Sequence, residues 1–427
     1  MSSYGRVERR LAKILDNFPA IRQKAKVLYQ YINYRVHARG SFSYEVADGW
    51  SMKTPSDIID GQLDPSVSDE FVGYFNISPW NYSGDLFFAH QKISKSDILN
   101  IVIYDLSQRK VSKVAETATW NWQQGSLTRW FDDRSLIYNC EFDGKVGAKV
   151  VSVDGSPLRS FDYPFQDLNL RAGLGVGVNP NRLNQIGSDY GYGVAGKNLA
   201  SLEDLNNDGV YIIDLHNNDI NLAVSIAEVI ECAGRSVMSN TGRHELNHVL
   251  FQPNGERFVF MHRWFGEGGR RSSLYLYEIA SRSFKRIIDT EMVSHYSWLD
   301  EDRLIIWCRG GDGVEFYHIC DVDTGKLRRV GGEDASSMGD GHPVSMKEGL
   351  VISDTYPDRV RRQHLFCFSI DVDSNSTTIG TFFSPLKFSG QMRIDLHPRV
   401  SRYGDISIDS GWSGKRRTYV ITPDARD

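Results

Sequence analysis

The sequence contains no long apolar run and only a few scattered cysteines. None of its 427 residues form an apolar stretch of 18, so we expect no membrane-spanning helix. The first ten residues, MSSYGRVERR, lack the apolar core of a signal peptide. The 5 cysteines show no CxxC spacing, which argues against a disulfide framework and a zinc ribbon. These absences predict a cytoplasmic protein with reduced thiols.

Two common functional signals are also missing. A net charge of -5 gives no reason to expect a nucleic-acid partner. No GxSxG occurs, so a serine-hydrolase nucleophile elbow is unsupported. The glycines at 173, 175 and 177 precede no helical pattern, so they do not form a dinucleotide-binding loop.

Positive charge is concentrated at the N-terminus. Residues 1–40 carry 9 Lys and Arg against only Glu8 and Asp16. Apolar residues recur there at helical spacing: Leu11, Ile14, Leu15, Phe18, Ile21, Ala25, Leu28, Tyr29, Ile32 and Val36. We expect an amphipathic basic helical extension over residues 1–40, kinked or divided at Pro19. Its apolar stripe either packs on the main domain or docks on a protein partner or a membrane surface.

Helical periodicity almost disappears after residue 40. Short β-rich runs such as LNIVIYDL, RFVFMHRW and SLYLYEI follow one another, separated by turn signals such as Asn254-Gly255 and Asp312-Gly313. Many short strands at regular spacing predict a sandwich, a barrel or a propeller. An internal repeat distinguishes among these three folds.

The repeat is a His seven residues before a turn residue. It occurs at His248, His295, His342 and His397, with spacings of 47, 47 and 55 residues. ISPWNYSG and LTRWFDDR share the frame without the His, and AGLGVGVNPN is a plausible start for one more repeat before His248. Seven units of four strands predict an all-β, seven-bladed β-propeller over residues 41–427. We expect a strand near residues 41–46 to complete the last unit and close the ring.

In a propeller, residues in the same register of successive inner strands face one another at the channel mouth. The four histidines are therefore expected to meet there. They could be blade-to-blade fasteners, but crowded neutral imidazoles favour a divalent cation: Zn, Mn, Ni or Fe. Asp340 and Asp395, each two residues before a His-Pro, are expected to accept a hydrogen bond from an imidazole or a neighbouring backbone amide. If a metal is bound, they would fix the tautomers of the imidazoles.

Loops between the second and third strands open on the same face and carry Arg, Trp and Tyr. Arg is a bidentate partner for carboxylates and sulfates, and the aromatic rings offer flat faces for sugars. An acidic oligo- or polysaccharide is therefore the expected partner. The candidate substrate-binding residues are Arg263, Trp264, Arg359, Arg361, Arg399, Trp412 and Arg416.

Tandem blades with His at the channel mouth, including His-Pro at the start of the late blades, resemble the seven-bladed polysaccharide lyases. Oligogalacturonate lyase is the nearest model, and the ulvan-type lyases are more distant. The resemblance implies a manganese ion held by three His and a Gln, and β-elimination at a uronate. It implies that His295, His342 and His397 are metal ligands, with His248 a fourth ligand or the base. The chain departs from the family at Arg399, where a second His is expected, and Gln391 lies too far upstream to supply the Gln.

Elimination needs a cation to neutralise the uronate carboxylate, a base at C5 and an acid for the leaving oxygen. We assign the base to His248, with His262 as substitute, and the acid to Tyr190 or Tyr356. Arg359 or Arg399 is the expected carboxylate clamp. The alternative is a non-catalytic propeller that binds glycans or scaffolds an assembly in polysaccharide metabolism or biosynthesis. A glycoside hydrolase is less favoured because the repeat frame yields no pair of carboxylates.

Overall fold

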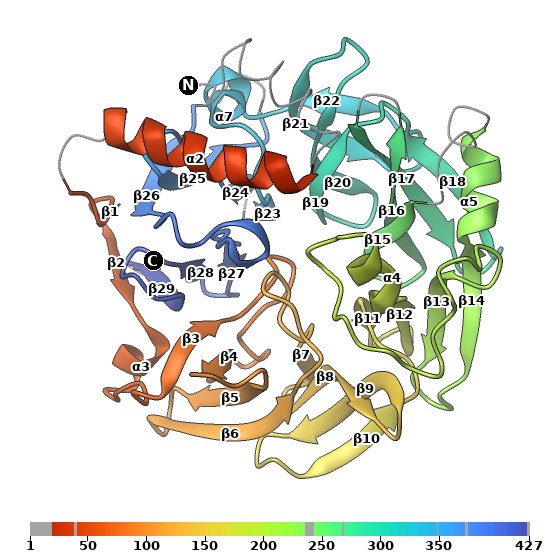
Figure 1. The fold of residues 1–427 in the computed structure, drawn as a ribbon, viewed down its shortest axis with the longest axis horizontal. Coiled ribbons are helices and arrows are strands. Elements are labelled where there is room, and N and C mark those ends of the chain that lie inside the picture. Colours follow the sequence, from red (N-terminus) through yellow and green to blue (C-terminus); the bar gives the residue numbers. More distant parts are fainter. Residues whose placement is uncertain are drawn as a thin grey trace.

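The computed structural model describes residues 19–37, 41–234, 243–266, 269–347, 349–371 and 375–424. Six four-stranded sheets and one five-stranded sheet are arranged around a central axis, each antiparallel and built mainly from consecutive strands (Figure 1). The chain is therefore a seven-bladed β-propeller, as the repeat predicts.

Each blade has its innermost strand first in chain order. Blades one to four consist of β3 (Val67–Phe71), β4 (Leu86–Ile93), β5 (Leu99–Asp105) and β6 (Lys110–Thr117); β7 (Arg129–Asp132), β8 (Ser135–Phe142), β9 (Lys145–Ser152) and β10 (Pro157–Phe161); β11 (Asp167–Asn169), β12 (Leu174–Val178), β13 (Gly209–Asp214) and β14 (Ile220–Ser225); and β15 (His244–Phe251), β16 (Arg257–Gly266), β17 (Gly269–Glu278) and β18 (Ser283–Ile288). Blades five to seven consist of β19 (Val293–Trp298), β20 (Arg303–Arg309), β21 (Glu315–Asp321) and β22 (Leu327–Arg329); β23 (Val344–Ser345), β24 (Leu350–Asp354), β25 (Arg362–Ser369) and β26 (Thr377–Phe383); and β27 (Arg399–Val400), β28 (Ile406–Ser410) and β29 (Arg417–Pro423).

The middle strands of the blades are buried on both faces because neighbouring blades pack face to face. In β4 and β5 nearly every side chain is buried, whereas the outer strand β6 is largely exposed. Val259 of β16 packs in one cluster with Ile306 of β20 in the next blade. Continuous apolar runs therefore form the middle strands, and the apolar area that they bury stabilises the ring.

The ring is closed by an N-terminal strand, but not by the expected one. β2 (Trp50–Lys53) pairs with β29 and supplies the fourth strand of blade seven. β1 (Tyr44–Val46) pairs with β26 and forms a fifth strand on blade six. The expectation of closure by residues 41–46 is therefore wrong by one strand, because the chain first follows the edge of blade six before it turns to blade seven.

The helix α2 (Pro19–His37) lies across one face of the ring, over blade six (Figure 1). The ring of Tyr34 lies 5.6 Å from that of Phe383 at the end of β26. Leu28, Ile32 and Val36 are 60%, 51% and 68% exposed, so this part of the apolar stripe does not pack on the propeller, which was one of the two expected alternatives. Residues 1–18 of the expected helical extension lie outside the described residues. None of the described helices is long and apolar enough to cross a membrane.

The other helices of the described residues are short connections between strands. They are α3 (Pro55–Ile58), α4 (Pro180–Gln185), α5 (Ile226–Ala233), α7 (Gly332–Met338) and the 3-10 turn η1 (Gly390–Met392).

The repeat frame predicted from the sequence corresponds to a backbone feature. Leu127, His248 and His397 occupy the same frame position in three blades, and their φ angles are 53°, 51° and 47°. Non-glycine residues rarely adopt this left-handed conformation, so its recurrence marks a shared bend at the entry to the inner strand. In blade three the frame position belongs to Gln166, seven residues before Gly173. AGLGVGVNPN instead lies mostly in the second strand, β12, which corrects the expected start of that repeat.

Candidate functional site

The four frame histidines meet at the channel mouth. Their side chains are 1–8% exposed. The ring centroids of His295 and His342 are 4.0 Å apart, those of His342 and His397 are 4.3 Å apart, and those of His248 and His295 are 6.4 Å apart. Because each His lies in or just before an inner strand at the same position of the repeat frame, the fold brings together residues that are up to 149 positions apart in the chain.

Three of these rings are fixed by a hydrogen bond at Nδ1. The Nδ1 atom of His342 lies 2.8 Å from Asp354 Oδ1, and that of His295 lies 3.2 Å from Asp340 Oδ1. The Nδ1 atom of His397 lies 2.8 Å from the carbonyl oxygen of Gly73. A proton on Nδ1 satisfies each acceptor and leaves the lone pair on Nε2. Imidazoles that hold a metal through Nε2 are usually oriented in this way.

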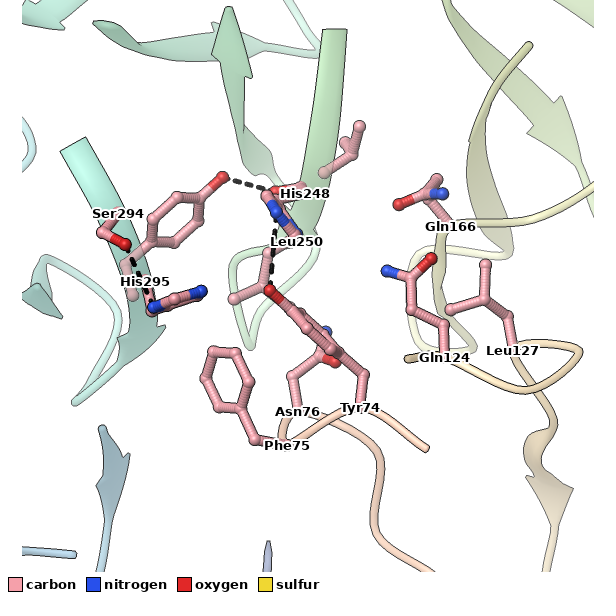
Figure 2. A pocket seen from close by; sticks show the side chains of 12 residues that line it. Tyr74, Phe75, Asn76, Gln124, Leu127, Gln166, His248, Leu250, Ser294 and His295 are labelled. Atoms are coloured by element: carbon pink, nitrogen blue, oxygen red, sulfur yellow. Dashed lines mark hydrogen bonds between the residues drawn. The ribbon is translucent and has the colours of Figure 1, made fainter. Parts of the chain in front are cut away.

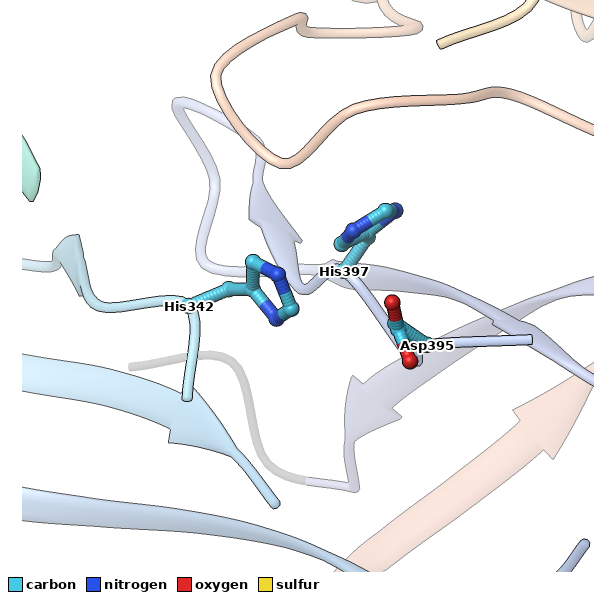
Figure 3. Close-up of side chains that lie close together, drawn as sticks. All are labelled: His342, Asp395 and His397. Atoms are coloured by element: carbon cyan, nitrogen blue, oxygen red, sulfur yellow. The ribbon is translucent and has the colours of Figure 1, made fainter. Parts of the chain in front are cut away.

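Two of the mouth histidines and one carboxylate form a compact group of possible ligands. Ligand atoms of His342, Asp395 and His397 all lie within 4.8 Å of one another, and all three residues are buried (Figure 3). The Nε2 atoms of both histidines and Oδ1 of Asp395 are buried and have no hydrogen-bond partner among the residues that the structure describes. Buried polar atoms are rarely left unpaired. Two imidazole nitrogens and a carboxylate oxygen suit a divalent transition metal, so the donor set fits such an ion.

The carboxylates around this group differ in part from the expected ones. Asp340 binds His295 as predicted. Asp395 binds no imidazole; it accepts a hydrogen bond from Arg393 Nε at 2.9 Å and lies among the candidate ligands instead. The carboxylate that binds His342 is Asp354, at the end of β24, which the sequence analysis missed. Gln391 is exposed and lies outside the group.

Burial and neighbouring charge set the protonation of the cluster. Burial lowers the pKa of His248 and His397 well below the usual value, and nearby positive charges act in the same direction. Burial also lowers the pKa of His295, although Asp340 opposes it. His342 differs because the buried Asp354 carboxylate outweighs the effect of burial and raises its pKa. Three of the four rings are therefore neutral near pH 7, the form that binds metal or accepts a proton.

A segment of blade one enters the channel beside the histidines. The strand β3 ends at Phe71, and Tyr74 and Phe75 then insert among the imidazoles (Figure 2). The ring of Tyr74 is stacked on His248 at 5.2 Å and meets the edge of His397 at 5.0 Å. The ring of Phe75 lies 5.1 Å from that of His342. The repeat frame gave no sign of this insertion. Its only sequence signal is the Gly-Tyr-Phe directly before the first repeat.

This inserted segment is held by blade seven. The Asp409 carboxylate accepts hydrogen bonds from the amides of Val72 and Gly73 at 3.1 and 3.2 Å. Arg399 donates to the carbonyl oxygens of Gly73 and Tyr74 and to Asp409. The Arg399 side chain is 1% exposed. Its guanidinium is therefore engaged below the mouth, which argues against the predicted carboxylate clamp.

Tyrosines and arginines surround the mouth. The ring of Tyr190 lies 4.7 Å from that of His248, and the ring of Tyr356 lies 6.1 Å from that of His342. Arg263 stands 5.9 Å from the Tyr190 ring, and its buried Nη1 atom lies 3.5 Å from a carboxylate oxygen of Glu245. Arg393 donates to Asp395 at the same rim and was missed by the sequence analysis.

Several predicted residues lie elsewhere. His262 and Trp264 point to the opposite side of β16 from Arg263, because side chains alternate along a strand. The Nε2 atom of His262 lies 3.1 Å from His244 Nδ1, and its ring neighbours are His244, Trp264 and Tyr275 rather than the mouth histidines. His262 is therefore not positioned to replace His248 as a base.

Four other predicted binding residues are engaged in structural contacts or lie on the surface. Arg361 is buried and donates to Ser384. Trp412 packs on Tyr44 at 4.4 Å. Arg416 is buried and donates to the carbonyl oxygens of Trp122, Met392 and Arg393. Arg359 is exposed. Burial thus directs the side chains of Arg361 and Arg416 into the walls of the blades, away from the expected binding face.

A small cavity adjoins the histidines within the channel. It is lined by Tyr74, His248 and His295 on one side and by Gln124 and Gln166 on the other (Figure 2). His248 thus borders both this cavity and the Tyr190 side of the mouth.

Comparison with known proteins places the fold but no family. No protein-family model matches the chain, and no curated protein matches its sequence. The structure of oligogalacturonate lyase from Vibrio parahaemolyticus aligns over 91% of this chain and 100% of its own, with 12% identity and a TM-score of 0.57. An oligogalacturonate lyase in complex with manganese aligns over 81% and 96%, with 11% identity and a TM-score of 0.36. TolB from Acinetobacter baumannii aligns over 85% and 69%, with 12% identity and a TM-score of 0.36. At these identities the likeness is one of fold, and the chain shares the seven-bladed propeller with oligogalacturonate lyase.

Proposed function

We propose that the protein cleaves an acidic, uronate-containing oligo- or polysaccharide by β-elimination at the channel mouth. The observation that carries this proposal is the group formed by His342, Asp395 and His397, whose ligand atoms lie within 4.8 Å of one another. Unpartnered buried atoms on all three residues support a divalent cation there. The likeness in fold to oligogalacturonate lyase is consistent with this chemistry but does not establish it.

His342, Asp395 and His397 would hold the cation, with His295 beside them. When bound, such an ion neutralises a uronate carboxylate and makes the neighbouring C5 proton more acidic. Manganese, zinc, nickel and iron all accept imidazole and carboxylate ligands. Arg393 and Arg263 border the same rim, but each is already ion-paired, Arg393 with Asp189 and Asp395 and Arg263 with Glu245, so the cation would be the main partner of the sugar carboxylate.

The residues of the chain provide the proton transfers. His248 is neutral and lies outside the compact ligand group, so we assign it the role of base. It takes the C5 proton; the electron pair left behind forms the C4=C5 double bond as the C4–O bond breaks. The leaving oxygen takes a proton from Tyr356, with Tyr190 as the alternative donor. Tyr356 is favoured because its ring lies 6.5 Å from that of His295 and 6.1 Å from that of His342, whereas the ring of Tyr190 contacts the base itself.

The direct test offers uronate polymers to untagged protein loaded in turn with manganese, zinc, nickel or iron. We expect an unsaturated product that absorbs in the ultraviolet. A His248→Ala variant should lose the product while retaining its metal content. Full activity of that variant on the same polymer would refute the assignment of the base. Absence of product from every polymer with metal bound would refute the lyase.

A second candidate is a non-catalytic glycan-binding or scaffolding propeller. The exposed side chains of Leu28, Ile32 and Val36 on α2 favour it, because an apolar helix face that the propeller does not cover is suited to a protein partner or a membrane surface. Removal of residues 1–37 would separate the two functions. It should abolish docking if α2 is the docking arm, and it should leave cleavage intact if the mouth alone is catalytic.

A further inference from the structure

The segment that carries Tyr74 is a fixed part of the site, built by residues from the other end of the chain. Asp409 holds its amides and Arg399 holds its carbonyl oxygens, across more than 320 positions of sequence. The position after Gly73 therefore has little freedom. Such restraint is typical of side chains that must be held at a defined distance from a reacting group.

The hydroxyl of Tyr74 is directed at the proposed base. Its oxygen lies 3.4 Å from Nε2 of His248, and the two rings are stacked with an interplanar angle of 10° (Figure 2). The backbone of the same histidine is also fixed, because the Tyr296 hydroxyl donates to the carbonyl oxygen of His248. His248 thus has a defined backbone and a single side-chain hydrogen-bond partner among the described residues.

The other ring nitrogen of His248, Nδ1, is buried and has no hydrogen-bond partner in the described part of the chain. Burial and then the positive charge of Arg263 are the main causes of the lowered pKa of this ring. Buried N–H donors are rarely left without an acceptor, whereas acceptors are left unpaired somewhat more often, so this nitrogen carries the lone pair rather than the proton. The ring proton then belongs on Nε2, from which it donates to the Tyr74 hydroxyl oxygen.

From these contacts we propose that Tyr74 is a positioning residue: its hydroxyl oxygen accepts the Nε2–H of His248 and thereby fixes the tautomer that presents the Nδ1 lone pair to the substrate. The assignment of the tautomer stands on the contacts alone, whereas the reaction in which the lone pair takes part rests on the proposed function. Nδ1 takes the C5 proton, the electron pair of the C–H bond forms the double bond, and the C4–O bond breaks. The Nε2–H bond to Tyr74 is kept throughout and stabilises the imidazolium that forms.

Arg399 is the residue that anchors the Tyr74 segment, and its contacts explain why the segment lies beside His248. Arg399 stands two residues after His397, where the resemblance to the lyases leads one to expect another His. In this chain that position supports the inserted tyrosine through the carbonyl oxygens of Gly73 and Tyr74. The residue that replaces the expected His, Arg399, is therefore the residue that holds the Tyr74 segment in the channel.

The test compares Tyr74→Phe with Tyr296→Phe in the full chain. Both variants remove one hydroxyl near His248 and keep the ring. Nitrogen chemical shifts of 15N-labelled histidine, assigned with a His248→Gln variant, report the tautomer without any substrate. We expect a predominantly Nε2–H signal in the parent protein and in Tyr296→Phe, and its loss or mixing in Tyr74→Phe. With an active substrate, kcat of Tyr74→Phe should fall by about 10–100-fold with KM within about twofold.

Each outcome has a distinct meaning. An unchanged His248 tautomer in Tyr74→Phe would overturn the positioning role, even if the protein is a lyase. So would a kcat equal to that of the parent protein. A tautomer that depends on Tyr74, in a protein that cleaves no uronate polymer, would sustain the positioning role and reject the proposed reaction.

Discussion

The Asp354 carboxylate joins the two histidines of the candidate metal group. One oxygen lies 2.8 Å from His342 Nδ1 and 2.8 Å from the amide of the same residue; the other accepts the amide of His397 at 3.0 Å. A single buried side chain thus fixes the ring of one ligand and the backbone of both. Carboxylates in this position usually raise metal affinity by orienting the ligand.

We therefore expect Asp354→Asn to weaken the binding of manganese or zinc by about 10–100-fold. Titration calorimetry on metal-free protein measures the change. The matched control is Asp340→Asn, which alters the carboxylate beside His295, outside the compact group. Equal losses in the two variants would show that Asp354 has no special relation to the metal.

Arg399 is expected to contribute stability rather than substrate affinity. Arg399→Ala leaves the Asp409 carboxylate buried without its cation and frees the Tyr74 segment. The free energy of unfolding should fall by about 3–5 kcal/mol in chemical denaturation. Arg402→Ala, which removes an exposed arginine of the same blade, should cost about 1 kcal/mol or less. A cost for Arg399→Ala no larger than that of Arg402→Ala would contradict the anchoring role.

Acid should destabilise the propeller through its buried neutral histidines. Burial lowers the pKa of His90 to about 4 and that of His262 to about 3. Below pH 6.5 or so the unfolded chain binds protons that the folded chain excludes, so stability falls as the pH is lowered. His90 alone should account for about 3 kcal/mol between pH 7 and pH 4. Urea unfolding across this range measures the slope, and His90→Gln should make it shallower; an unaltered slope would contradict the assignment.

The pairing of β2 with β29 should determine the integrity of the ring. Ser51 and Thr422 are directly paired across these strands. A Ser51→Cys, Thr422→Cys pair, in a background with Cys232→Ser, should form a disulfide that stabilises the fold by about 2–4 kcal/mol. The thermal midpoint should rise on oxidation and return on reduction. A midpoint that is insensitive to the redox state would place the closure of the ring elsewhere.

The sequence was sufficient for the architecture because the repeat is local. A His or its equivalent lies seven residues before each turn, and this spacing reflects the short hairpin between the first two strands of a blade. The frame position Gln166 was missed for two reasons. It is a Gln rather than a His, and it lies only 39 residues after Leu127, a shorter spacing than that between the histidines. The long loop between β12 and β13 then makes the distance from Gln166 to His248 longer than one repeat. The closing strand was misplaced because two short N-terminal strands, β1 and β2, pair with the outer strands of two neighbouring blades. The sequence does not show which of the two strands pairs with which blade.

The contents of the site were less predictable because they depend on contacts between distant parts of the chain. The Tyr74 segment is positioned by Asp409, which lies 337 residues away from Val72. Likewise, Arg361 and Arg416 belong to loops of the expected face, yet their side chains bind carbonyl oxygens inside the blades. The repeat in the sequence was enough to predict which histidines meet. Which charged side chains remain at the mouth depends on tertiary packing, which the repeat does not contain.

The most direct test of the account is the metal content of untagged protein, measured by mass spectrometry after dialysis against trace metals, for the parent chain and for His397→Ala. We predict about one divalent transition-metal ion per chain in the parent and a loss of most of it in the variant. A parent protein that binds no such ion when manganese, zinc, nickel and iron are offered, or a variant that binds as much as the parent, would contradict the claim that the mouth histidines form a metal site.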